Sequence, residues 1–262
     1  MTFTRWRVVV LSLALFATGS WAVGVLRERS ARRRWTETLR VAVVVISPGA
    51  PPADQVDAVS RGLGQLEERL AQEATRYAPG APRPFAIDVV GPVSAAAPPL
   101  PPEGGLLVRA RHALELWRAL RAIHAGVVGF TPRAYDARLY LTLVPPAEAR
   151  PRFAEGVGAA GGEVGLVRAA VDPADPTLAV EALAHELLHC LGATDKYGAD
   201  GHAQAPEGLA DPGQAPTFPQ RRADVMGVEV ALGPHAGRLP ASVDELAVGP
   251  ATAIEIGWAR SD

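Results

Sequence analysis

The segment LRVAVVVISP, residues 39 to 48, determines the fold class more than any other part of the sequence. It is almost continuously apolar, is rich in β-branched Val and Ile, and ends at Pro48. Such a run is typical of a strand that is buried in the interior of a sheet. We therefore expect it to form a central strand of a sheet that helices cover.

The segments that follow alternate between the two kinds of structure. Further strands are predicted at 85–93, 137–145 and 163–172, and helices at 54–77, 110–124 and from Pro176 onward. The helix at 110–124 has one apolar face, made of Leu114, Trp117, Leu120 and Ile123. This order predicts an α+β domain, close to the α/β class, within residues 36–262.

Composition limits the possible functions. The 262 residues are 48% apolar, which is enough for a substantial core, and their formal net charge is −2. That charge gives no reason to expect a nucleic acid partner. The single cysteine, Cys190, excludes an internal disulfide, and its place on an apolar helix indicates a core residue. We expect a monomer.

The N-terminal segment differs from the rest. Residues 8–26 carry no charge, and Arg7 and Arg27 flank them. Nineteen helical residues would just cross a hydrocarbon core of about 30 Å, so we predict a single-pass membrane anchor within residues 1–35. A cleaved signal peptide, with the mature chain starting at Val23, is the alternative. The arginines after the segment are predicted to contact anionic headgroups. We expect the domain to be extracytoplasmic, but the arginine count leaves the side of the membrane open.

The segment AHELLHCLGATDKYG, residues 184 to 198, carries the chemistry. His185 and His189 are four residues apart, so on a helix they share a face and can bind one zinc ion. Glu186 lies about 100° around the helix, beside the metal, where it can take a proton from water. Gly192 allows the chain to turn back and deliver Asp195 as the third ligand.

Several neighbouring residues leave alternatives open. His202 and His235 are other candidates for the third ligand. Tyr197 is either a hydrogen-bond donor to a reaction intermediate or an ordinary loop residue. Two histidines and a glutamate on an apolar helix would be costly to bury without a partner, which favours a metal site over a coincidence of spacing. Three protein ligands and an open fourth position are typical of catalytic zinc.

The segment from His185 to Asp195 resembles the metzincin signature HExxHxxGxxH, in the variant that ends in aspartate, as in snapalysin-type proteases. Met226, in ADVMG at 223–227, is similar to the Met-turn of that family. The resemblance implies a zinc endopeptidase with a twisted mixed sheet, a backing helix and an active-site helix. It also implies a smaller irregular subdomain, from about residue 193. A second resemblance, to aspzincins, is weaker because GATDKYG directly follows the helix.

The remaining C-terminal segments are predicted to frame the site. Residues 198–221 contain few apolar groups and are expected to form a long surface loop or lid. Residues 242–258 are expected to form two short helical pieces, capped by Ser242 and anchored by Trp258. The sequence thus predicts a membrane-anchored zinc metallopeptidase that acts on peptides or proteins. The alternative is a non-catalytic envelope protein that binds metal and retains the fold.

Overall fold

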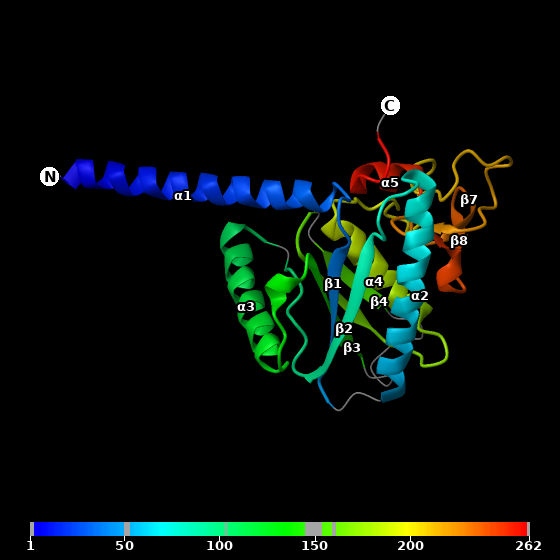
Figure 1. Cartoon of the computed structure of the whole chain (residues 1–262), viewed down its shortest axis with the longest axis horizontal. Helices are drawn as coiled ribbons and strands as arrows, with labels where there is room; N and C mark the ends of the chain where they lie inside the picture. Colours follow the sequence, from blue (N-terminus) through cyan, green and yellow to red (C-terminus); the bar gives the residue numbers. More distant parts are fainter. Residues whose placement is uncertain (1–2, 50–52, 103, 145–153, 159–160, 261–262) are drawn as a thin grey trace.

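The computed structural model describes residues 3–49, 53–102, 104–144, 154–158 and 161–260 (Figure 1). Within these residues the main sheet has five strands in the order β2-β1-β3-β5-β4. They are β1 (Leu39–Ser47), β2 (Phe85–Ser94), β3 (Ala137–Leu143), β4 (Ala154–Gly158) and β5 (Val164–Ala169). All neighbours pair in parallel except β4, which runs antiparallel to β5 at one edge. The predicted α+β class is therefore confirmed, with a mixed sheet.

Alternate side chains of β1 serve two hydrophobic cores. Val43 and Val45 pack in the larger core, with side chains of α2 (Ala53–Tyr77) and α4 (Thr177–Cys190). Val44 and Ile46 point to the other face, where Ile123 of α3 (Leu106–Ala125) packs. Successive residues of a strand point to opposite faces, so a strand that is covered on both faces must be apolar throughout. This explains the composition of the 39–48 segment.

One strand was not predicted. The residue patterns predict strands near β1, β2, β3 and β5, but none at Ala154–Gly158. This strand has the sequence AEGVG, and two glycines in five residues give it little strand propensity. It forms because β5 supplies a pairing partner and α4 lies against it.

The C-terminal part consists of small elements. Strands β6 (Ala223–Asp224) and β9 (Leu246–Ala247) pair in parallel, and β7 (Val230–Gly233) and β8 (Ala236–Arg238) form a hairpin. The chain continues through η2 (Val243–Glu245) and α5 (Pro250–Ile256), while η1 (Pro132–Ala134) lies earlier, before β3. The two predicted helical pieces are therefore present. Ser242 occupies the N-cap of η2, as predicted, although its side chain makes no capping hydrogen bond.

A buried carboxylate joins the pieces of this C-terminal part. The Oδ1 atom of Asp224 accepts hydrogen bonds from the backbone of Met226 at 2.8 Å and of Gly227 at 3.2 Å. Its carboxylate also accepts from the Gly249 backbone and, at 3.0 Å, from the Thr252 hydroxyl at the start of α5. Burial raises the pKa of Asp224 to about 6. This carboxylate thus fixes the turn that contains Met226 against the C-terminal helix.

The N-terminal segment forms the helix α1 (Phe3–Arg32), which extends away from the body of the molecule (Figure 1). No helix in the described part of the chain has both the length and the apolar character that a membrane span requires, so the predicted transmembrane helix is not supported. Arg32 is buried and donates to the backbone oxygens of Gly161 at 3.0 Å and Gly162 at 3.2 Å. The prediction that the arginines after the segment contact headgroups is therefore wrong for Arg32, which docks α1 on the body.

The expected apolar face of α3 is only partly used. Ile123 is its single buried side chain, and all twenty residues of this helix are described. Leu114 and Trp117, which were predicted on the same face, are 46% and 55% exposed. Leu116 and Leu120 are partly buried and pack against the core beside Ile123, so only part of the predicted face contacts the sheet.

Candidate metal centre

The helix α4 carries two histidines that face each other. Their rings lie 4.6 Å apart between centroids and are perpendicular. Eleven of the fourteen residues of α4 are buried, His185 and Glu186 among them. The i, i+4 spacing puts both imidazoles on one side of the helix, as the sequence predicted.

Backbone carbonyls fix the orientation of both rings. The Nδ1 atom of His185 lies 3.0 Å from the carbonyl oxygen of Val225, and that of His189 lies 2.8 Å from the carbonyl oxygen of Ala193. A carbonyl only accepts, so each Nδ1–H donates. Each Nε2 of a neutral imidazole then presents a lone pair, and burial lowers the pKa of His185, which favours that neutral form. Metal-binding histidines are held by hydrogen bonds of this kind.

Asp195 completes the group. Its Oδ1 atom lies 3.1 Å from Nε2 of His185 and 3.1 Å from Nε2 of His189. Ligand atoms at about 2.1 Å from a tetrahedral zinc ion are separated by about 3.4 Å, close to these distances. Three acceptor atoms that converge repel one another unless a cation or an added proton lies between them. The donor set of two imidazoles and one carboxylate therefore fits zinc.

The turn after α4 places Asp195 beside the histidines. Gly192 has φ of +99°, a left-handed conformation that few residues other than glycine adopt. Glu255 of α5 then holds both neighbours of Asp195. It accepts from the backbone and the hydroxyl of Thr194, both at 2.8 Å, and from Nζ of Lys196 at 2.8 Å. The position of Asp195 thus depends on a residue 60 positions further along the chain, which no spacing in the sequence indicated.

Glu186 lies buried under the edge strand. Three glycines, Gly156 and Gly158 of β4 and Gly165 of β5, let the backbone approach it, because a Cβ atom at any of them would overlap Glu186. No described group hydrogen bonds with its Oε2 atom. Burial, together with the negative charge of Asp195, raises the pKa of Glu186 to about 8. A carboxyl group with a pKa near neutrality is suited to accepting and releasing protons.

The Met-turn candidate also contacts this region through its backbone. Met226 is fully buried, and its carbonyl oxygen accepts from the backbone of Lys196 at 2.9 Å, next to Asp195. The preceding carbonyl, that of Val225, is the one that holds His185. The segment around Met226 thus supports two of the three candidate ligands.

The other candidates from the sequence lie elsewhere or at the rim. His202 pairs with Glu229 at 3.3 Å, and the exposed His235 pairs with Asp200 at 3.3 Å, so neither belongs to the cluster with Asp195. Tyr197 lies closer, with its ring 6.1 Å from that of His185. Burial, and then the charge of Asp195, raise the pKa of this tyrosine. Its hydroxyl therefore stays protonated near the cluster.

The predicted lid is more ordered than its composition suggested. Tyr197 and Ala203 form an isolated bridge, and so do Leu209 and Ala223. Ala203 and Leu209 are buried in a small hydrophobic cluster, with Phe218 packed against it. The segment 198–221 is therefore not simply a surface loop, because these few apolar residues give it a core of its own.

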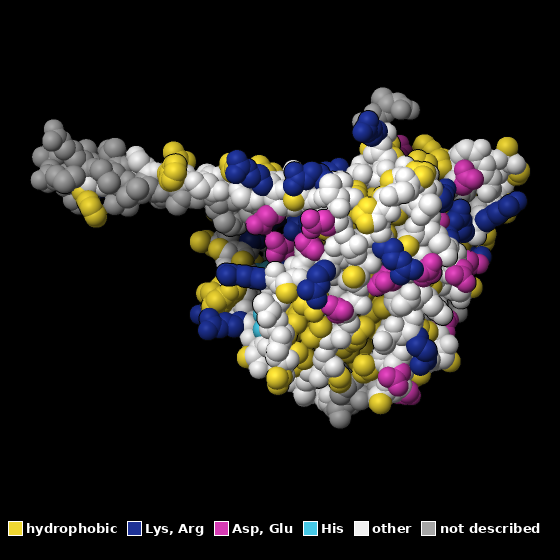
Figure 2. All heavy atoms as spheres, viewed as in Figure 1, with side chains coloured by type: hydrophobic (Ala, Val, Ile, Leu, Met, Phe, Trp, Pro, Cys, Tyr) yellow, Lys and Arg dark blue, Asp and Glu magenta, His cyan; other side chains and the backbone are white. Residues whose placement is uncertain are grey.

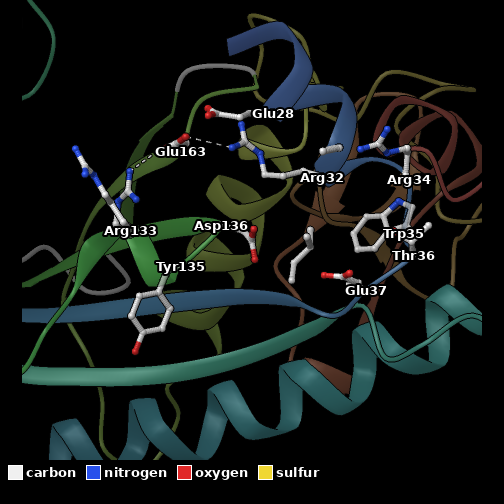
Figure 3. A pocket seen from close by; sticks show the side chains of 13 residues that line it. Glu28, Arg32, Arg34, Trp35, Thr36, Glu37, Arg133, Tyr135, Asp136 and Glu163 are labelled. Atoms are coloured by element: carbon white, nitrogen blue, oxygen red, sulfur yellow. Dashed lines mark hydrogen bonds and ion pairs between the residues drawn. The ribbon is translucent and has the colours of Figure 1, made fainter. Parts of the chain in front are cut away.

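A polar cavity of about 610 Å³ lies at the base of α1 (Figure 3). None of its lining residues belongs to the histidine cluster. Three of its charged residues form a paired group, since Glu163 binds Arg32 at 3.5 Å and Arg138 at 2.6 Å. We interpret this cavity as the junction between α1 and the sheet.

Comparisons with known proteins do not assign a family. No protein-family model matches the chain, and no curated protein matches it. The cluster of His185, His189 and Asp195 is thus interpreted from its own chemistry.

Proposed function

We propose that this protein is a zinc-dependent metallopeptidase of metzincin type. His185, His189 and Asp195 would hold the metal, and the remaining coordination position would be free for water or substrate. The observation that carries the proposal is the convergence of two Nε2 atoms and one carboxylate oxygen. The Oδ1 atom of Asp195 lies 3.1 Å from Nε2 of His185 and 3.1 Å from Nε2 of His189. The buried Glu186 directly follows the first ligand, where a proton acceptor is required.

The residues of the chain have separate roles in this proposal. Zinc, when bound, polarises a carbonyl group and lowers the pKa of water towards neutrality. Glu186 accepts a proton at its carboxylate and donates it to the leaving amine, which its raised pKa favours. Asp195 and the two histidines hold their positions through Glu255 and the carbonyls of Val225 and Ala193. The hydroxyl of Tyr197 is available as a hydrogen-bond donor at the rim.

The edge strand favours a peptide as the substrate. Among the described residues β4 pairs only with β5, so the backbone groups of its other side can pair with an extended chain. Glycines of β4 lie directly over the carboxylate of Glu186. A peptide that added to this edge would therefore run past the proposed proton acceptor.

The alternative function is that of a non-catalytic metal-binding protein of the cell envelope. Glu186 distinguishes the peptidase from the metal-binding protein, because a protein that only binds metal does not need an acid with a raised pKa beside the metal. The Glu186→Gln variant should keep its zinc and its fold but lose hydrolysis of a mixed peptide library by about 10²–10⁴-fold. His202→Gln is the matched control and should retain activity. If Glu186→Gln cleaves as fast as the wild type, and chelator stops both, another group is the base.

Membrane anchoring through the N-terminal segment also stays a proposal. It is supported by the absence of charge in residues 8–26. The protein should then remain in the membrane fraction after an alkaline carbonate wash. A mature N-terminus at Val23 would instead indicate that a signal peptide had been removed.

A further inference from the structure

The outer face of α3 exposes large apolar side chains. Leu106 and Leu107 are 83% and 86% exposed, and Leu114 and Trp117 are about half exposed. Scattered exposed apolar residues are ordinary, but these four follow one another on a single helix. The opposite face of the helix packs on the sheet through Leu116, Leu120 and Ile123.

Arginines accompany this apolar face. α3 contains four arginines and one glutamate, and the glutamate is paired with Arg111 at 2.8 Å. Leu107, Leu114, Arg118 and Arg121 follow at intervals of seven, four and three residues, which places them on one side of the helix. The guanidinium of Arg121 also lies over the ring of Trp117, 5.5 Å from its centroid. The exposed face is thus both apolar and basic.

The position of α3 determines the side of the molecule on which this face lies. Figure 1 shows α3 on the side of the sheet towards which α1 extends. Figure 2 shows apolar and basic side chains gathered there, below α1. Leu11, Leu15 and Phe16 of α1 are 66%, 75% and 75% exposed. α1 therefore also exposes apolar side chains on the side of the molecule where α3 lies.

We propose that α3 is an interfacial helix that binds the surface of an anionic lipid bilayer. Leucine and tryptophan would enter the boundary between headgroups and acyl chains, and the arginines would bind the headgroups. A second copy of this chain fits the face less well, because it would bring two sets of arginines together without acidic partners. The proposal is independent of the peptidase chemistry, and it does not require α1 to cross the membrane.

Sedimentation of the full chain with vesicles tests the proposal. The vesicles would contain phosphatidylcholine alone, or phosphatidylcholine with phosphatidylserine. The double variant Arg118→Gln/Arg121→Gln should bind the vesicles that contain phosphatidylserine about tenfold more weakly than the wild type. The matched control, Arg61→Gln/Arg83→Gln, removes two exposed arginines from another face and should bind like the wild type. Because α1 is present in every variant, the difference reports on α3.

Fluorescence supplies a second readout. Brominated lipid should quench the wild type more than Trp117→Phe, since Trp117 would lie within reach of the acyl chains. The proposal is overturned if the double variant binds like its control, or if Trp117→Phe is quenched as much as the wild type. It is also overturned if light scattering reveals a dimer that the Trp117 substitution dissolves, since a second copy would then occupy the face. Circular dichroism would verify that each variant is folded.

Discussion

The helices α3 and α4 depart from ordinary burial in opposite ways. α4 buries eleven of fourteen residues, and these include Glu181, His185 and Glu186. α3 buries one residue of twenty and exposes leucines and a tryptophan. Buried ionisable groups and exposed apolar surface both cost free energy unless a partner compensates them. The difference indicates that each helix has a partner, and the partners we propose are a metal ion and a substrate at α4 and a lipid surface at α3.

The largest expected effect is a difference in stability between two leucine substitutions, one on each helix. Leu188 of α4 is fully buried, so Leu188→Ala should lower the free energy of unfolding by about 2–5 kcal/mol. Leu107 of α3 is 86% exposed, and Leu107→Ala should change it by no more than about 0.5 kcal/mol. Denaturant unfolding of both variants measures the contrast. Equal losses would mean that α3 packs against something in the folded protein.

A smaller effect concerns the support of Asp195. Glu255→Gln replaces one carboxylate oxygen by an amide nitrogen, which cannot accept from the Thr194 backbone or from Lys196. Loss of such support usually weakens metal affinity by about 10–100-fold, and zinc titration against a competing chelator would measure it. Glu245→Gln, which breaks an exposed pair with Arg238, is the control and should leave affinity unchanged. Unchanged affinity in Glu255→Gln would show that Asp195 is held by other groups.

The smallest effect is a dependence of stability on pH. Burial raises the pKa of Glu181 to about 8, and neither carboxylate oxygen hydrogen bonds with any described group. Between about pH 5 and pH 8 the folded carboxyl keeps its proton while the unfolded one has lost it, so stability falls as the pH rises. Glu181→Met should remove the contribution of Glu181 to this slope and add about 1–2 kcal/mol at pH 8. Denaturant unfolding at about pH 5 and at pH 8 tests this prediction. A variant that is less stable than the wild type at pH 8 would indicate a partner for Glu181.

The sequence predicted the elements whose patterns are local. The β-branched run at 39–48 can hardly form anything but a buried strand, and the spacing of His185 and His189 fixes their common face. The turn at Gly192 and the candidate ligand Asp195 were also predicted from local spacing. The spacing on α3 indicated an apolar stripe, but spacing alone does not tell which part of a stripe packs. That is why Trp117, which is exposed, was assigned to the same apolar face as the buried Ile123.

Contacts between distant segments could not be predicted in this way. β4 depends on pairing with β5, and its glycines are explained only by the carboxylate of Glu186 beneath them. Glu255 lies in a short helix with no motif, and the bond from His185 goes to a carbonyl, which every residue has. These interactions become visible only when the chain is folded, because they depend on tertiary packing and not on residue type.

The metal content of the purified chain tests the central claim most directly. After dialysis against zinc and removal of excess metal, elemental analysis should find about one zinc per wild-type chain. His189→Ala should hold none, because only His185 and Asp195 would remain as ligands, and His202→Ala should hold as much as the wild type. A folded wild-type chain without zinc, or a His189→Ala chain that keeps it, would contradict the account.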